Sequence, residues 1–283
     1  MGIVMSGIEV AKHMKIELSQ KVLSLKERGI EPCLSIIRVG KKEEDLSYER
    51  GAMKRMEMLG ISCQVLELPE NIEQSAFENA FQLLNEDPHI HGILVFQPLP
   101  EHLDIEPIKN AIHPMKDVDG MCKDNVAKVF MGDKEGFAPC TAEAVMEILA
   151  HYEVNVSGKN VVVVGRSMVI GKPVSMLLLQ ENGTVTIAHS RTEKLPEVVR
   201  QADIVVAAVG SAKMITSDMI SEDAIVVDVG INVDENGNLC GDVDFNEVEK
   251  VASMITPVPR GVGSVTTSVL AKHVIRAAEK LNK

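Results

Sequence analysis

Short apolar runs alternate with stretches of helical spacing along most of the chain. Runs rich in Val and Ile predict strands at 32–40, 63–68, 92–96, 160–164, 184–188, 204–209 and 224–229. Apolar residues spaced three or four apart predict helices at 7–28, 44–59, 74–84, from about 173, near 195–200 and at 266–281. Such alternation is typical of βαβ units around a mostly parallel sheet. The pattern therefore predicts an α/β protein.

The periodicity fades between Ile112 and Thr141, where we expect a loop-rich stretch followed by a helix with Thr141 as its N-cap. A series of predicted strands and helices lies on each side of it. We place one domain at 1–140 together with the last helix at 266–283, and the other at 141–265. No linker rich in Pro or Ser separates them, so we expect a small-molecule ligand in a cleft between the domains.

Composition and charge exclude several classes of function. The 283 residues carry 29 Lys and Arg against 41 Asp and Glu, a net charge of −12, and only 3% are aromatic. This balance disfavours a nucleic-acid surface, and no apolar run is long enough to cross a membrane. Five scattered cysteines without CxxC spacing indicate neither a disulfide framework nor a metal site, so we expect a cytoplasmic protein without a metal.

Residues 161–173 resemble a strand, a glycine turn and a helix start of the kind that binds phosphate. Gly165 follows a run of four valines, and Gly171 and Pro173 lie at the start of the next predicted helix. Backbone N–H groups and the helix dipole favour a pyrophosphate there, and glycine lets it approach the main chain. The spacing is not GxGxxG, since Ser167 replaces the middle glycine, so a tight turn in a sheet without a ligand is the alternative.

The next strand, 184–188, ends where a dinucleotide fold contacts the ribose of its cofactor. An NAD site usually has an acidic residue there, but this chain has Ser190 and Arg191. A guanidinium suits the extra phosphate of NADP, and Arg166 adds a second one. The sequence therefore favours NADP over NAD, although a solvated loop cation is the alternative for Arg191.

Several of these segments together resemble the methylenetetrahydrofolate dehydrogenase/cyclohydrolases of the FolD type, over almost the whole length. The motifs that carry the resemblance are Lys116–Gly120 with Asn125, Pro139–Thr141, Val164–Ser167 with Gly171–Pro173, His189–Ser190, Asp228–Asn232, Gly241–Val243 and Thr256–Pro259. The resemblance implies oxidation of methylenetetrahydrofolate with NADP, followed by hydrolysis of the methenyl product to formyltetrahydrofolate. It also implies a homodimer, a Rossmann-like C-terminal domain and a folate in the interdomain cleft.

Carried over by position, the resemblance also implies site residues. Tyr48 and Asp119 match catalytic positions, because Tyr48 corresponds to a tyrosine beside the folate and Asp119 to the acid that binds the pterin. The implied substrate-binding residues are Tyr48, Phe96, Gln97, Pro98, Leu99, Asp119, Pro259 and Gly261. The implied cofactor-binding residues are Gly165, Arg166, Ser167, Gly171, Ser190, Arg191 and Ile231. Without the resemblance, Asp119 would be interpreted as a turn residue and Ile231 as core.

Two positions depart from the family where the cyclohydrolase step is assigned. The lysine that the family has four residues after the tyrosine is Ala52, and the glutamine of the strand end is Phe96. Neither neighbouring cation replaces this lysine. On a helix, Lys54 is rotated by about 240° from Tyr48 around the axis, and the guanidinium of Arg55 is a poor proton carrier. Because hydrolysis needs water activation, we expect a dehydrogenase with impaired or absent cyclohydrolase activity.

The alternatives are a fully bifunctional enzyme and a non-catalytic folate- or nucleotide-binding paralogue. A further departure is Arg260, which replaces a family glycine. If that position needs positive φ, arginine strains the turn or the loop has changed shape. Its side chain either contacts a ligand or points into solvent.

Overall fold

The computed structural model describes residues 2–283, and the chain divides into two compact units. The three-stranded unit comprises His13–Cys140 and Thr267–Lys283. The six-stranded unit comprises the residues up to Lys12 together with Thr141–Thr266. We expected the first twelve residues in the N-terminal domain. Residues 2–12 group with the later residues instead, because β1 (Ile3–Val4) pairs with β11 (Met254–Ile255).

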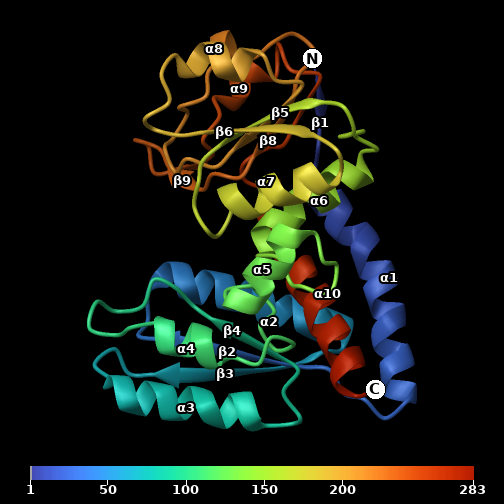
Figure 1. Cartoon of the computed structure of the whole chain (residues 1–283), viewed down its shortest axis with the longest axis vertical. Coiled ribbons are helices and arrows are strands. Elements are labelled where there is room, and N and C mark those ends of the chain that lie inside the picture. The colour runs from blue at the N-terminus through green and yellow to red at the C-terminus, as the bar shows by residue number, and fades with distance from the viewer. Residues whose placement is uncertain (1) are drawn as a thin grey trace. The chain divides into compact units, whose positions relative to one another are not determined.

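The three-stranded unit is a parallel sheet in the order β3-β2-β4, covered by helices (Figure 1). Its strands are β2 (Cys33–Val39), β3 (Ser62–Leu68) and β4 (Gly92–Val95). Its helices are most of α1 (Gly7–Glu27), α2 (Glu43–Leu59), α3 (Gln74–Glu86), α4 (Glu106–Ala111), α5 (Lys123–Met131) and most of α10 (Gly263–Leu281). An apolar core that includes Phe77, Phe81 and Ile108 joins α3 and α4 to the sheet.

The six-stranded unit is an all-parallel sheet in the order β1-β11-β8-β7-β5-β6. The remaining strands of this sheet are β5 (Asn160–Val164), β6 (Thr184–Ala188), β7 (Ile204–Ala207) and β8 (Ile225–Asp228). Its other elements are α6 (Cys140–His151), α7 (Gly171–Gln180), α8 (Leu195–Arg200), the 3₁₀ helix η1 (Ser217–Met219), the hairpin of β9 (Asn232–Val233) with β10 (Leu239–Cys240), and α9 (Phe245–Val248). The predicted α/β class and Rossmann-like second domain are confirmed.

Strand order places a topological switch point in this sheet. After β5 the chain adds β6 on one side, and it then returns to place β7 on the other side. Loops that leave neighbouring strands in opposite directions open a crevice at the carboxyl ends of the strands, which is where α/β sheets bind their ligands. The crevice lies between the ends of β5 and β7.

Two expectations about the middle of the chain are wrong. The stretch between Ile112 and Thr141 contains α5, which begins after Cys122, whose Sγ accepts the N–H of Asn125. Thr141 does not cap the next helix, because α6 begins at Cys140 and includes Thr141 in its first turn. No helix among residues 2–283 is long and apolar enough to span a membrane.

Candidate functional site

Tyr48 and Ala52 lie on one side of α2, one turn apart. Residues four apart on a helix differ by only about 40° around its axis, so the two side chains share a stripe. Tyr48 is half-buried, and Ala52 has 0% of its surface exposed. Lys54 is exposed and Arg55 is half-buried, and burial lowers the pKa of the Arg55 guanidinium. The stripe therefore has no cationic side chain at the level of Ala52.

Phe96 packs directly against Tyr48. The two ring centroids are 5.7 Å apart with an interplanar angle of 66°, an edge-to-face arrangement, and Phe96 is only 8% exposed. Strand β4 ends at Val95, so Gln97 lies beyond it, exposed, with its Nε2 3.9 Å from the Sδ of Met121. An aromatic ring thus lies beside Tyr48, at the position where the resemblance implies that the family has a glutamine.

The two residues after Gln97 have different surroundings. Pro98 is exposed, and its carbonyl accepts a hydrogen bond from the Nζ of Lys42 at 3.1 Å. Leu99 is half-buried and packs against the core of the three-stranded unit.

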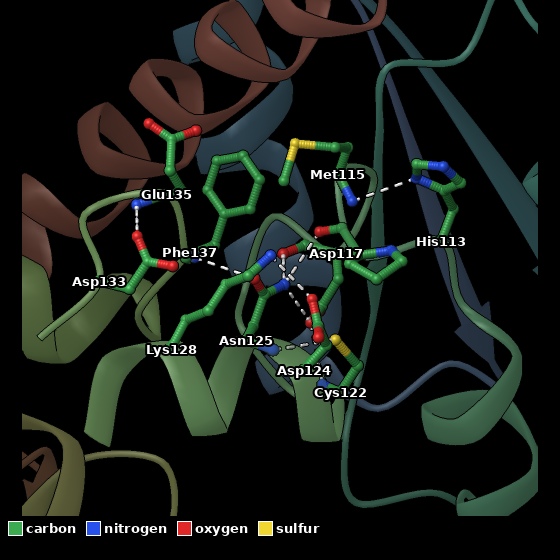
Figure 2. A network of polar contacts seen from close by, with 12 residues as sticks. His113, Met115, Asp117, Cys122, Asp124, Asn125, Lys128, Asp133, Glu135 and Phe137 are labelled. Atoms are coloured by element: carbon green, nitrogen blue, oxygen red, sulfur yellow. Dashed lines mark hydrogen bonds and ion pairs between the residues drawn. The ribbon is translucent and has the colours of Figure 1, made fainter. Parts of the chain in front are cut away.

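The loop that carries Asp119 is fixed by a buried network around Asp117 (Figure 2). The Asp117 carboxylate accepts the N–H groups of Met121 and Cys122 and the Nδ2 of Asn125, at 2.9 to 3.0 Å. The Oδ1 of Asn125 in turn accepts the N–H of Phe137. Asp117 and Asn125 are fully buried, so these bonds pair groups that water cannot reach.

Asp119 itself is half-buried, and its Oδ1 accepts the N–H of Cys140 at 2.8 Å, at the start of α6. The carbonyl oxygen of the preceding residue, Val118, lies 2.8 Å from the Nδ1 of His273 and accepts a hydrogen bond from the thiol of Cys140. Gly120 follows with φ +64°, and a Cβ there would meet the Phe137 carbonyl at 2.3 Å. The Asp119 backbone is therefore fixed on both sides.

Asp119 and Cys140 are close enough to Tyr48 to affect its ionisation. Burial raises the pKa of Tyr48 well above its ordinary value, and the charges of Cys140 and Asp119 add to the rise. Burial also raises the pKa of Asp119, which the Cys140 N–H partly offsets. Tyr48 is thus a neutral phenol near pH 7, able to donate a hydrogen bond but unsuited to act as a base.

In the six-stranded unit, the turn from β5 to α7 requires glycine at two places. Gly165 has φ +140°, and a Cβ on it would meet the carbonyl of Ala208 at 2.2 Å. A Cβ on Gly171 would meet the Gly165 carbonyl at 2.3 Å, and Ser167 Oγ accepts the N–H of Ile170. The turn lies at the switch point, with exposed residues leading into the N-terminus of α7. This arrangement suits a phosphate.

The predicted ribose-side residues follow the neighbouring strand. Val164 pairs with Ala188 at the ends of β5 and β6, so Arg166 and Arg191 leave adjacent strands at the same edge of the sheet. Both arginines and Ser190 are exposed. Among residues 2–283, neither guanidinium forms an ion pair with a carboxylate.

A cavity of about 210 Å³ lies beyond the end of β8 and is lined by Ile231, Pro259, Arg260 and Gly261. Ile231 is 69% exposed, so it is not the core residue that its hydrophobicity alone suggests. Arg260 has φ +78°, so arginine does occupy a left-handed position here. Its carbonyl accepts the N–H of Gly7. Pro259 and Gly261 belong to the six-stranded unit, whereas the other predicted substrate residues belong to the three-stranded one.

Sequence reasoning missed the residues that hold these loops. Asp117, His273, Asp228 and Asp242 are buried polar side chains with several hydrogen bonds each, and none was predicted to have a role in the site. Asp117, Asp228 and Asp242 stand inside the quoted motifs, which was the available signal. The sequence did not show which loops their carboxylates bind.

Comparison with known proteins gives matches over both units. Residues 5–119 match the catalytic domain of tetrahydrofolate dehydrogenase/cyclohydrolase, and residues 139–282 match the NAD(P)-binding domain of the same family. The bifunctional protein FolD of Clostridioides difficile is 54% identical over 281 residues, which are 99% of this chain and 98% of that protein.

Solved structures of the family also superpose on the chain. The FolD dehydrogenase/cyclohydrolase of Campylobacter jejuni is 40% identical, with a TM-score of 0.97 over 99% of both chains. The Trypanosoma brucei enzyme, in a complex with NADP and an inhibitor, is 38% identical with a TM-score of 0.93, over 99% of this chain and 98% of that one.

Proposed function

The chain belongs to the tetrahydrofolate dehydrogenase/cyclohydrolase family, and on that premise we propose that it oxidises methylenetetrahydrofolate to methenyltetrahydrofolate with NADP while its cyclohydrolase activity is impaired or absent. The observation that supports the loss of cyclohydrolase activity is the pair of apolar side chains beside Tyr48. Ala52 is fully buried, and Phe96 packs its ring on the tyrosine.

Tyr48 and Asp119 are the residues we assign to the dehydrogenase step. Loss of a hydride from the methylene carbon leaves a delocalised cation on the folate. A carboxylate fixed next to the pterin holds the ring by hydrogen bonds and stabilises that charge. The loop around Asp119 supplies the rigidity this requires, since its neighbours are held by His273, Cys140 and the Asp117 network. Tyr48 orients the substrate as a neutral hydrogen-bond donor.

The six-stranded unit suits NADP. Gly165 and Gly171 allow the turn from β5 to α7 to pack main chain against main chain, and the N-terminus of α7 that follows favours a pyrophosphate. NADP when bound accepts the hydride. The exposed guanidiniums of Arg166 and Arg191 would hold the additional phosphate, and the Trypanosoma brucei relative was solved with NADP bound. We assign Ser167, Ser190 and Ile231 to the same cofactor site.

Phe96, Gln97, Pro98 and Leu99 complete the substrate site that we propose around Tyr48. We also propose that Pro259 and Gly261 of the six-stranded unit bind substrate. Their support is positional: they stand where the resemblance implies substrate-binding residues, although Phe96 replaces the glutamine of the family.

The cyclohydrolase step needs a group that activates water and carries a proton. The Asp119 carboxylate near Tyr48 accepts the N–H of Cys140 and is assigned to the pterin. The other groups at this place are the Tyr48 phenol, which stays protonated at neutral pH, a buried alanine and a phenylalanine ring. None of them removes a proton from water. The dehydrogenase step needs alignment and electrostatic stabilisation, which these substitutions leave in place.

A fully bifunctional enzyme is the second candidate, and the names of relatives such as the Clostridioides difficile bifunctional protein favour it. Two assays on one preparation separate the candidates. NADP reduction with methylenetetrahydrofolate measures the first activity, and loss of methenyltetrahydrofolate absorbance against a buffer blank measures the second. NADP reduction without accelerated methenyl loss supports the proposal, and acceleration well above the blank overturns it. Ligand binding without either turnover would indicate a non-catalytic paralogue.

Adding back the two polar groups sharpens the test. We expect Ala52→Lys with Phe96→Gln to raise methenyltetrahydrofolate hydrolysis about tenfold or more, because a lysine joins the Tyr48 stripe. Met53→Lys is the matched control: Met53 is 40% exposed and lies about 140° around the helix axis from Tyr48, so this lysine points away from that stripe. Retained NADP reduction shows that the double variant is folded. An active control variant would contradict the role assigned to this stripe.

The same family membership supports a cytoplasmic homodimer. Light scattering behind size-exclusion chromatography tests the oligomeric state, with twice the 30.8 kDa chain mass expected. A monomer peak would contradict it.

A further inference from the structure

Two buried carboxylates lie next to each other in the six-stranded unit, apart from the residues assigned so far. Asp228 is the last residue of β8, and Asp242 follows the β9–β10 hairpin with 0% of its surface exposed. Among residues 2–283, no Lys or Arg forms an ion pair with either. Buried carboxylates without a cation must be stabilised by N–H donors.

Asp242 receives its donors from two separate loops. Its Oδ2 accepts the N–H groups of Val209 at 2.6 Å and Gly210 at 3.1 Å, and its Oδ1 accepts the N–H of Ser211 at 2.8 Å. These three residues follow β7. The same Oδ1 accepts the Nδ2 of Asn232 at 2.9 Å, from the segment that follows β8. One carboxylate therefore joins the loops after two neighbouring strands.

Asp228 completes the arrangement. Its Oδ1 accepts the N–H groups of Gly230 and Asp242 at 3.0 Å, and its Oδ2 accepts the N–H of Val243. A Cβ on Gly230 would lie 2.3 Å from the Asp242 Cγ, and one on Gly241 would lie 1.8 Å from the Asp228 Oδ2. The main chain thus passes in contact with both carboxylates, where only glycine fits.

These loops lie at the side of the crevice away from β6. Strand β7 borders the switch point and β8 is next to it, so a dinucleotide with its pyrophosphate at the β5–α7 turn extends toward their carboxyl ends. Ile231 stands between Gly230, tied to Asp228, and Asn232, tied to Asp242. It projects into the 210 Å³ cavity with 69% of its surface exposed. With so much of the side chain exposed, its position depends largely on its backbone.

We propose that Asp242 is a positioning residue of the cofactor site: by joining Val209–Ser211 to Asn232 it fixes Ile231, and thereby the wall against which the nicotinamide end of NADP lies. This inference rests on the proposed function. Asp242 is fully buried, so we assign it no direct contact with cofactor or substrate.

The test is Asp242→Asn, which keeps the shape of the side chain but places an NH₂ among N–H donors. We expect the Kd for NADPH to rise about tenfold and kcat to fall, because buried donors lose their acceptor. The KM for methylenetetrahydrofolate should change by less than about twofold. A role in stability alone would lower the folded fraction and leave the Kd unchanged. Asp244→Asn is the matched control, since the Asp244 side chain makes no capping hydrogen bond at the start of α9.

Asn232→Ala serves if Asp242→Asn does not fold. It removes one donor and leaves the carboxylate, so a smaller rise in the Kd for NADPH and faster amide exchange around Ile231 are expected. An unchanged Kd in the folded variants overturns the proposal.

Titration of NADPH by fluorescence separates this proposal from the proposed function. A wild-type protein that binds NADPH without turnover would refute the dehydrogenase and still allow the Kd comparison. A wild-type protein that does not bind NADPH would refute both.

Discussion

The loop that carries Asp119 and the turn from β5 to α7 are both held rigid, but in opposite ways. The Asp119 loop is tied by buried side chains, above all Asp117, whose carboxylate binds three donors (Figure 2). The β5–α7 turn is shaped by missing side chains, since Gly165 and Gly171 allow main chain to pass within contact of main chain. The first loop presents a carboxylate, and the second presents backbone N–H groups.

This difference follows from the charge each region has to hold. A cation that develops on a folate needs a negative side chain in a fixed place, so the loop must hold an acid rigidly. A pyrophosphate needs several N–H groups pointing the same way, which a helix start and a glycine turn provide without any side chain. Substitutions should therefore affect the two regions differently.

The largest effect is expected at the glycine turn. Gly165→Ala places a Cβ 2.2 Å from the Ala208 carbonyl at φ +140°, so both overlap and strain oppose it. We expect the free energy of unfolding to fall by about 3 to 5 kcal/mol and NADPH binding to be lost. Gly158→Ala is the control, because Gly158 also has positive φ, +76°, but open space around it. Urea denaturation compares them, and equal losses would show that overlap contributes nothing.

A smaller effect is expected in the side-chain-tied loop. Asp117→Asn turns one acceptor into a donor that faces N–H groups, which should cost about 2 to 3 kcal/mol of unfolding free energy. The KM for methylenetetrahydrofolate should rise while the Kd for NADPH stays the same. Asp124→Asn changes the same group seven residues on, in an exposed ion pair with Lys128. That control should lose less than about 1 kcal/mol, and a KM that does not respond to Asp117→Asn would contradict the comparison.

The contribution of Asp228 to stability should change with pH in the opposite direction to that of a salt-bridged acid. Burial raises its pKa from 3.8 to about 6, against the N–H bonds from Val243, Asp242 and Gly230. The folded state therefore binds this proton more tightly than the unfolded state. Its contribution to stability is fully present below about pH 4 and is lost as the pH rises through about 6.

The comparison of wild type with Asp228→Asn isolates this effect. The difference in unfolding free energy should shift in favour of wild type by about 1 to 2 kcal/mol as the pH falls from 7 to 4. Unfolding in urea at several pH values measures it. A constant difference would show that Asp228 keeps an ordinary pKa.

The smallest effect concerns which dinucleotide the glycine turn holds. Arg191→Ala should raise the KM for NADP about fivefold to tenfold and leave the KM for NAD unchanged, because only NADP carries the additional phosphate. Lys194→Ala removes a cation three residues away and should change neither. Equal changes in the KM values for NADP and NAD would show that Arg191 does not bind the additional phosphate.

Local signals were sufficient where one element or one turn decided the structure. The valine run and glycines of β5 and α7, the strand 184–188 and the helix 195–200 have the predicted positions. Helix α5 escaped prediction because its pattern is reversed: Asn125 is buried, whereas Phe130 and Met131 are 73% and 69% exposed. Strands β1 and β11 have two residues each, too few for any periodicity, and exist through pairing with distant segments.

The substitutions beside Tyr48 show the same division. Helical geometry predicted that Ala52 shares the Tyr48 stripe, because four residues make about one turn. That the Phe96 ring packs edge-to-face on Tyr48 depended on how β4 meets α2, which no local pattern contains.

By itself the sequence determined the α/β class and the glycine turn at 165–171, since these depend on periodicity and steric limits. That Ala52 and Phe96 stand where the family has polar groups is what the resemblance implies. The tertiary structure decided which buried carboxylates hold which loops: Asp117 the loop of Asp119, and Asp242 with Asp228 the loops around Ile231. A hydrogen bond forms wherever folding brings donor and acceptor together, so its partners are set by the packing of distant segments and not by spacing along the chain.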